Sequence, residues 1–277
     1  MLLNGEDIHM KIGVIGYGSM GKMLLDKFSE GGLSKDELLV ANRTKEKLSE
    51  CAGYATVCDN RGVASASDIV FVCVRPVHMK GILEEIRDNL REETLLVSLN
   101  GSITFEMLDK VVSHKTAKVI PSLTAEIGRS QTIVCYNDKV TSEDKDNVRR
   151  LLSIIGKVIE LPEEEVGMGS ELVSCMPGFI ASIFDVICRK AKEHTSIPEE
   201  KIVEMVLNTM SATGDLMLRK DMSFEEVVTR VATKGGITEE GTKVIYEMFP
   251  EAAGEMFEKT LEKRRATAKK AADAFSS

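Results

Sequence analysis

The pattern of hydrophobic and polar positions shows two different rhythms along the chain. Over residues 10–161, short and almost continuously apolar runs alternate with stretches of helical periodicity. That alternation is typical of a parallel sheet covered by helices on both faces. The predicted strands are residues 11–15, 38–41, 54–57, 68–74, 94–99, 117–120, 132–136 and 157–161. Only the last of them are expected to depart from parallel order.

The second rhythm begins after Pro162, where the β-rich runs stop and about five amphipathic helices are predicted. Two S-x-x-E segments, at Ser196 and at Ser223, have the spacing of a capping box that begins a helix. We therefore expect an α/β fold in which a doubly wound sheet precedes an all-helical domain. The predicted parts are an N-terminal extension (1–9), the sheet domain (10–161) and the helical domain (162–277).

Composition narrows the class of protein mainly by exclusion. The 277 residues include 36 Lys and Arg against 44 Asp and Glu, a net charge of −8 that argues against nucleic acid as a partner. No uninterrupted apolar run approaches 20 residues, so no membrane span is expected, and residues 1–9 lack the basic start of a signal peptide. Six cysteines without a CxxC pair and four scattered histidines predict reduced thiols, a cytoplasmic location and no metal site.

The first candidate binding site is the segment GVIGYGSMG, which includes the end of a predicted strand and the start of a predicted helix. Its G-x-G-x-x-G spacing in that context indicates a dinucleotide site. Gly16 permits the tight turn, Gly18 lets a pyrophosphate approach the backbone, and Gly21 lets helix and strand pack closely. The expected pyrophosphate site comprises Gly16, Tyr17, Gly18, Ser19, Met20 and Gly21. The alternative is a glycine-rich turn without a ligand.

The end of the second strand favours NADPH over NADH. A site for NAD usually has Asp or Glu there, to bind the ribose 2′-hydroxyl. This chain has Asn42, Arg43 and Thr44 instead. A cation with small polar donors suits a 2′-phosphate, although an exposed arginine without a ligand is the simpler alternative.

Three later loops should border the same cofactor. They follow the fourth, fifth and sixth predicted strands, whose carboxyl ends share the edge where doubly wound folds bind ligands. The candidate cofactor residues in these loops are Val74, Arg75, Pro76, Asn100 and Ser122.

Together these segments resemble the pyrroline-5-carboxylate reductase family. The shared pieces, in the family's order, are GVIGYGSMG, ANR, the elements Cys73–Pro76 and Val119–Pro121, Pro177, and TKGGIT. The resemblance implies a Rossmann-type domain followed by a helical dimerisation domain, and a homodimer that assembles further into a ring of dimers. It also implies NADPH-dependent hydride transfer to the cyclic imine 1-pyrroline-5-carboxylate, giving L-proline.

The resemblance places the substrate at the Gly-Gly segment, where backbone N–H groups would hold its carboxylate. The implied substrate residues are Thr233, Gly235, Gly236, Thr238 and Pro177, with Thr238 as the catalytic candidate. On physical grounds, Thr238 is expected to cap the following helix, and the two glycines to turn their N–H groups toward an anion. Acidic residues follow directly at 239 and 240 and would repel a carboxylate that they face. A plain Gly-Gly turn between helices is the alternative.

Several departures from the family pattern lie on the substrate side. Ser122 replaces an asparagine, and the segment Val173–Phe179 has larger residues where the family has small ones. Two other functions therefore stay open: an NADP(H)-binding regulatory or assembly protein without turnover, and a hydroxyacid dehydrogenase. The dehydrogenase needs a helical lysine such as Lys190 or Lys192, but the strand motif that accompanies it is missing.

Overall fold

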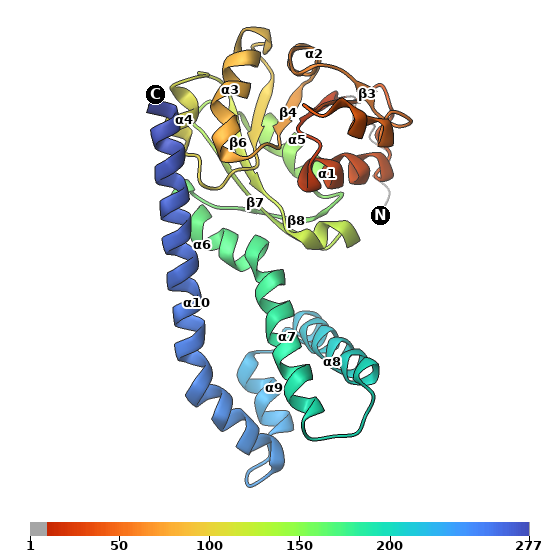
Figure 1. Ribbon diagram of the computed structural model, residues 1–277, viewed down its shortest axis with the longest axis vertical. Helices are drawn as coiled ribbons and strands as arrows, with labels where there is room; N and C mark the ends of the chain where they lie inside the picture. Colours follow the sequence, from red (N-terminus) through yellow and green to blue (C-terminus); the bar gives the residue numbers. More distant parts are fainter. Residues whose placement is uncertain (1–9, 277) are drawn as a thin grey trace. The chain divides into compact units, whose positions relative to one another are not determined.

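The computed structural model describes residues 10–276 and divides them into two compact units. One unit runs to Pro177 and also includes the chain from Leu261 onward, and the other is Gly178–Thr260. The first unit is built on an eight-stranded sheet (Figure 1). Its strands are β1 (Ile12–Ile15), β2 (Leu38–Ala41), β3 (Thr56–Val57), β4 (Ile69–Val72), β5 (Leu95–Ser98), β6 (Thr116–Ile120), β7 (Ser130–Tyr136) and β8 (Gly156–Glu160).

The strand order is β3-β2-β1-β4-β5-β6-β7-β8. Every neighbouring pair is parallel except β6 and β7, so β7 and β8 run against the other strands. The order reverses between β1 and β4, and in doubly wound folds the ligand crevice lies at the carboxyl edge of such a switch point. The eight predicted strands and the reversal at the end of the sheet are confirmed.

Helices cover both faces of this sheet because the central strands are apolar throughout. The helical elements of the first unit before Pro162 are α1 (Ser19–Glu30), η1 (Lys45–Glu50), α2 (Asn60–Ala66), α3 (Pro76–Ile86), η2 (Arg87–Asn89), α4 (Phe105–Asp109), η3 (Leu123–Ile127) and α5 (Ser142–Leu152). On one face Phe28 of α1 packs against Phe71 of β4, with ring centroids 5.6 Å apart. On the other face, Met79 and Leu83 of α3 are fully buried.

The C-terminal end of the chain belongs to the sheet domain. Helix α10 (Ile237–Ser276) contributes its last turns to the first unit, where Ala271 and Phe275 are buried in one core with Leu108 of α4 (Figure 1). Short helical segments connect the sheet to the helical half: η4 (Glu163–Glu165), α6 (Val166–Ser170) and the π-helical segment η5 (Glu171–Cys175). The sheet domain is therefore completed by residues that lie far from it in the sequence.

The second unit is helical and contains most of α7 (Met176–Lys192), α8 (Glu199–Lys220), α9 (Phe224–Val231) and the first part of α10. The expected capping box of α9 is present, since Glu226 N–H donates to Ser223 Oγ at 3.2 Å. The expected box at Ser196 is wrong. Helix α8 begins after Pro198. This proline is the N-cap residue, and its side chain has no atom that can accept a hydrogen bond.

Many large apolar side chains of this helical unit are exposed, among them Val186, Met205, Leu218, Tyr246 and Met248. By length and apolar composition alone, residues 163–192 would suffice to cross a membrane, a test that helices of other proteins also pass. No uninterrupted apolar run is present in this stretch, because polar residues interrupt it; only its mean hydropathy is high. The predicted boundary near residue 162 stays a prediction, because the sheet ends at Glu160 whereas compactness divides the chain after Pro177.

Candidate functional site

The three glycines of the first loop have the geometry that their spacing predicts. Gly16 has a φ of 104°, and a Cβ there would lie 2.6 Å from the carbonyl oxygen of Cys73. A Cβ on Gly21 would lie 1.9 Å from the carbonyl oxygen of Gly16, so α1 approaches the loop more closely than any side chain allows. A Cβ on Gly18 would meet no atom within 4 Å, so the space above its backbone is open to a ligand.

Within residues 10–276, no side chain caps the N-terminus of α1, where the helix dipole places partial positive charge. Gly18 is the N-cap residue, no side chain caps the helix, and the first turn contains no acid. The first turn of a helix leaves backbone N–H groups without carbonyl acceptors, and together with the helix dipole they favour an anion. The open space at Gly18 and this uncapped helix fit the pyrophosphate of a dinucleotide.

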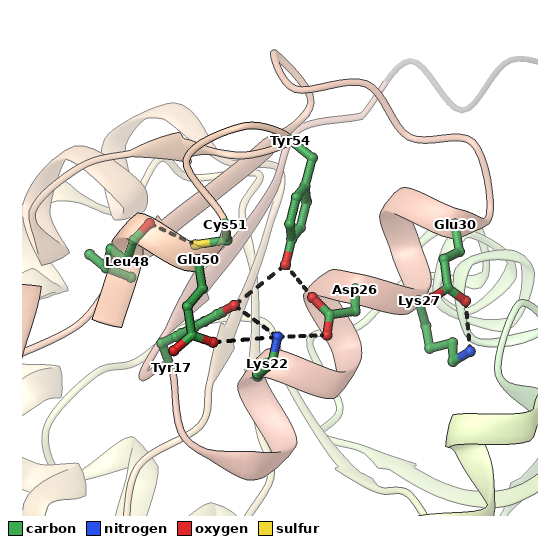
Figure 2. A network of polar contacts seen from close by, with 9 residues as sticks. All are labelled: Tyr17, Lys22, Asp26, Lys27, Glu30, Leu48, Glu50, Cys51 and Tyr54. Atoms are coloured by element: carbon green, nitrogen blue, oxygen red, sulfur yellow. Dashed lines mark hydrogen bonds and ion pairs between the residues drawn. The ribbon is translucent and has the colours of Figure 1, made fainter. Parts of the chain in front are cut away.

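A network of polar side chains holds the glycine loop in place on its protein-facing side (Figure 2). Tyr17 is buried, and its hydroxyl lies 3.4 Å from that of Tyr54 and accepts a hydrogen bond from Lys22 Nζ at 3.4 Å. Lys22 also contacts Asp26 at 3.1 Å and Glu50 at 3.6 Å, and the hydroxyl of Tyr54 donates to Asp26. The side chain between the first two glycines thus points into the protein and leaves only its backbone at the loop.

Ionisation in this network follows from its contacts and its burial. The hydrogen bond to the Asp26 carboxylate holds the pKa of Lys22 above its usual range. Burial, followed by the same carboxylate, raises the pKa of the Tyr54 hydroxyl. At neutral pH both tyrosines stay protonated and Lys22 stays charged. Sequence reasoning missed Lys22, Asp26 and Tyr54, although the i, i+4 spacing of Lys22 and Asp26 is a signal for an ion pair.

Asn42 connects the pyrophosphate loop to the loop after β2. Its Oδ1 accepts a hydrogen bond from Tyr17 N–H at 3.0 Å, and its Nδ2 donates to the carbonyl of Thr44 at 2.9 Å. Thr44 is the N-cap residue of η1, and Arg43 between them is exposed. Asn42 therefore connects two loops, and the binding of a 2′-phosphate by the exposed Arg43 stays a prediction.

The loops after β4 and β5 meet at the expected edge. Asn100 donates through Nδ2 to the carbonyl of Val74 at 2.9 Å. Arg75 is the exposed N-cap residue of α3, and Pro76 begins that helix, where its missing N–H is not needed. The neighbouring thiol of Cys73 has its pKa raised to about 12 by burial, so it stays protonated.

Ser122, the candidate in the loop after β6, lies in a different environment. Its side chain is buried, and its Oγ accepts a hydrogen bond from Thr124 N–H at 3.4 Å. Its own N–H donates to Ser130 Oγ at 3.0 Å. These contacts hold the start of η3, and a contact of Ser122 with the cofactor stays a prediction.

Pro177 lies in the first turn of α7, directly after the π-helical segment η5. A proline inside a continuous helix lacks an N–H donor and clashes with the carbonyl four residues earlier. A wider π-turn before it relieves both problems, and such turns are frequent at functional sites.

The Gly-Gly segment differs from the expectation in two respects. Helix α10 begins at Ile237, so Thr238 lies inside its first turn and is not the N-cap residue. The N–H of Gly235 donates to Glu239 Oε2 at 2.7 Å, and the N–H of Gly236 donates to the carbonyl of Thr233 at 2.8 Å. Both glycine N–H groups are therefore bound within the chain, because Glu239 reaches back from the first turn.

The glycines themselves have a clear conformational reason. Gly235 has a φ of 76°, which favours glycine, and a Cβ on Gly236 would lie 2.6 Å from Thr233 Oγ1. The predicted cofactor residues and Pro177 belong to the first unit, whereas Thr233, the two glycines and Thr238 belong to the second. Among residues 10–276, no group of three or more His, Cys, Asp or Glu side chains could hold a metal ion.

Comparison with known proteins finds a different family model for each half of the chain. A family model described as NADP oxidoreductase coenzyme F420-dependent matches residues 11–101, and one described as pyrroline-5-carboxylate reductase dimerisation matches residues 163–267. Pyrroline-5-carboxylate reductase 3 of Bacillus subtilis (strain 168) is 32% identical over 258 residues, covering 91% of this chain and 95% of that protein. ComE operon protein 4 of the same strain is 25% identical over 256 residues, covering 91% and 94%.

Solved structures give the same fold. The crystal structure of a Plasmodium falciparum pyrroline carboxylate reductase with NADP bound matches with a TM-score of 0.84 and 21% identity, covering 97% of this chain and 100% of that one. At this identity the likeness concerns the fold, which is the predicted doubly wound sheet followed by helices.

Proposed function

Because the chain belongs to the pyrroline-5-carboxylate reductase family, we propose that it reduces the cyclic imine 1-pyrroline-5-carboxylate to L-proline with NADPH. The observation that carries the proposal is the open glycine loop in front of the uncapped α1, in a chain that aligns over nearly its whole length with a reductase. NADPH, when bound, supplies the hydride. A protonated C=N bond accepts hydride without a strong side-chain acid, so the protein acts mainly by positioning and by its charges.

The residues of the first unit divide the binding of the cofactor among them. The backbone of Gly16–Gly21 and the N-terminus of α1 would hold the pyrophosphate, and Arg43 the 2′-phosphate. Val74, Arg75, Pro76 and Asn100 would border the nicotinamide half at the carboxyl edge of the sheet.

The substrate side is assigned to the Gly-Gly segment and Pro177. A carboxylate that binds the N–H of Gly235 would take the place that Glu239 Oε2 holds in this structure. Thr238, one residue before Glu239 in the first turn of α10, is the neighbouring hydroxyl group and remains the catalytic candidate.

We propose a homodimer formed through the helical domain, and a ring of such dimers as its further assembly. The dimerisation family match and the exposed apolar side chains of the second unit support a second copy as the cover for this surface. The apolar stretch 163–192 lies within the same match, so contact with a second copy explains its apolar character without a membrane. With no lipid contact required, a cytoplasmic location is proposed.

A direct assay tests the activity. Purified protein is mixed with NADPH and 1-pyrroline-5-carboxylate, and the loss of nicotinamide absorbance is followed together with the formation of proline. We expect turnover with NADPH that exceeds turnover with NADH. NADPH binding without any turnover would contradict the proposed reaction.

That outcome would favour a second candidate function, an NADP(H)-binding protein without catalysis. Two observations motivate it: the glycine N–H groups are already bound within the chain, and the segment Val173–Phe179 carries larger residues than the family pattern. The third reading, a hydroxyacid dehydrogenase, loses support. Lys190 pairs with Glu193 and Lys192 donates to the carbonyl of Ile197, both as exposed local contacts at the end of α7.

A further inference from the structure

The loop after β5 occupies a special place on the carboxyl edge. The residues suited to the 2′-phosphate follow β2, on one side of β1, so the cofactor should extend from there past β1 toward β4 and β5. Its nicotinamide half is then expected beside Asn100 and Gly101. Asn100 is held by its hydrogen bond to the carbonyl of Val74. Gly101 is held by other residues, which belong to two ion pairs.

One partly buried ion pair holds Gly101 from the sheet side. Lys118 on β6 is only 1% exposed, and its Nζ lies 3.0 Å from Glu163 Oε1 and 3.4 Å from the carbonyl oxygen of Gly101. Glu163 Oε1 also accepts a hydrogen bond from Phe105 N–H at 2.8 Å. A charged group in the sheet thus binds the loop through its carbonyl.

A second ion pair holds the loop from the C-terminal helix. Arg264 of α10 donates through Nε and Nη2 to Glu171 Oε1, at 3.0 and 2.7 Å. Its remaining nitrogen, Nη1, lies 3.3 Å from the position that a Cβ on Gly101 would occupy. Glu171 is 1% exposed, and its Oε2 has no hydrogen-bond partner among the residues that the structure describes. Arg264 therefore provides the main compensation for a buried carboxylate, and its guanidinium covers the face of Gly101 from which a side chain would project.

We propose that Arg264 and Glu171 are positioning residues for the nicotinamide half of the cofactor. Glu171 holds the guanidinium in one orientation, and the guanidinium limits the movement of Gly101 toward the side from which a side chain would project. Hydride transfer requires the two reacting carbons to meet within a narrow range of distances, so a loop displaced by about 1 Å slows the reaction about a hundredfold. This inference rests on the proposed function only for its kinetic readout.

The test uses two conservative variants of the full-length protein, Arg264→Lys and Glu171→Gln. Lysine keeps the charge but loses the planar fork of donors, and glutamine keeps the shape but loses the charge. Arg149→Lys and Asp146→Asn are matched controls, because Arg149 and Asp146 form an exposed ion pair at 2.8 Å on α5. Circular dichroism and the melting temperature establish that each variant is folded.

The first readout is independent of turnover. The affinity for NADPH is compared with that for 2′,5′-ADP, which has the 2′-phosphate but lacks the nicotinamide. We expect both variants to weaken NADPH binding about tenfold relative to 2′,5′-ADP, and both controls to leave this ratio unchanged. An unchanged ratio in either folded variant would overturn the proposal, whether or not the protein reduces an imine.

The second readout is kinetic. With NADPH deuterated at C4, kcat of Arg264→Lys and Glu171→Gln should fall about tenfold or more and the isotope effect should rise, since hydride transfer becomes limiting. An unchanged kcat and isotope effect in a folded variant would mean that the pair is only structural. If the wild-type protein shows no turnover, the proposed function fails, and the affinity ratio alone decides the role of the pair.

Discussion

At the scale of single residues, the proposed site combines side chains that are expected to face the cofactor with side chains that hold the loops in place. Arg43 belongs to the first group, since it is exposed beside the loop after β2. Tyr17 and Asn42 belong to the second, because their polar atoms bind Tyr54, Lys22 and neighbouring loops. This division predicts different consequences for substitutions that lie only one residue apart.

Replacing Arg43 by alanine should change the choice of cofactor. The guanidinium is expected to bind the 2′-phosphate that distinguishes NADPH from NADH. We expect Arg43→Ala to weaken NADPH binding about tenfold or more, with the affinity for NADH changed much less. Isothermal titration with both cofactors measures this. Equal weakening of the two would overturn the assignment of Arg43 and the preference for NADPH.

At the scale of elements, the proposed substrate side depends on the start of α10. The first turn of this helix provides Glu239, whose carboxylate binds Gly235 N–H at 2.7 Å. Lys243 lies 3.8 Å from the same carboxylate oxygen and 2.7 Å from Glu240. An acid in the first turn also stabilises the helix through its dipole. The start of α10 thus has its hydrogen bonds made without a ligand. A substrate carboxylate that binds Gly235 N–H would have to displace the Glu239 carboxylate.

Replacing Glu239 by glutamine should make that displacement easier. The neutral amide binds the glycine N–H less strongly than a carboxylate and does not repel a substrate anion. We expect KM for 1-pyrroline-5-carboxylate to fall about two- to fivefold, with kcat and NADPH affinity nearly unchanged. Steady-state kinetics checks this, with Glu240→Gln as the matched control. A KM that rises in Glu239→Gln would show instead that Glu239 assists substrate binding.

The elements also show which features a sequence can predict. The strands follow from apolar runs that only a two-sided sheet accommodates, and the roles of Gly16, Gly18 and Gly21 follow from their spacing. Sequence reasoning places the start of α10 two residues too late, because threonine and glycine are both good caps and local preference does not separate them. The Glu239 contact depends on a rotamer, which no spacing specifies.

Contacts between distant segments are harder still to predict. Glu171 and Arg264 are 93 residues apart, and the sequence near each of them reads as ordinary helix. Lys118 lies inside an apolar strand, where a buried lysine is unusual and would have been a signal for a paired charge. Tertiary packing alone brings Lys118 and Arg264, each with its acidic partner, close to Gly101.

At the scale of the whole molecule, the exposed apolar side chains of the second unit predict self-association. Val186 is 56% exposed, Met205 50% and Tyr246 63%, values more typical of an uncovered interface than of a monomer's surface. We expect light scattering to give a mass of at least two 30.5-kDa chains, and a melting temperature that rises with protein concentration. A mass of one chain with a concentration-independent melting temperature would contradict the dimer.

The return of α10 to the sheet domain has a consequence for the order in which the protein is made. Chains emerge from the ribosome N-terminus first, at about 5–20 residues per second. All strands of the sheet are complete once residue 160 has been added, whereas Arg264 and Phe275 come last. The nascent chain can therefore form its glycine loop about a hundred residues before it acquires Arg264, the side chain that covers Gly101. A ribosome-bound chain therefore has all the residues of the proposed pyrophosphate site before Arg264, on the nicotinamide side, has been added.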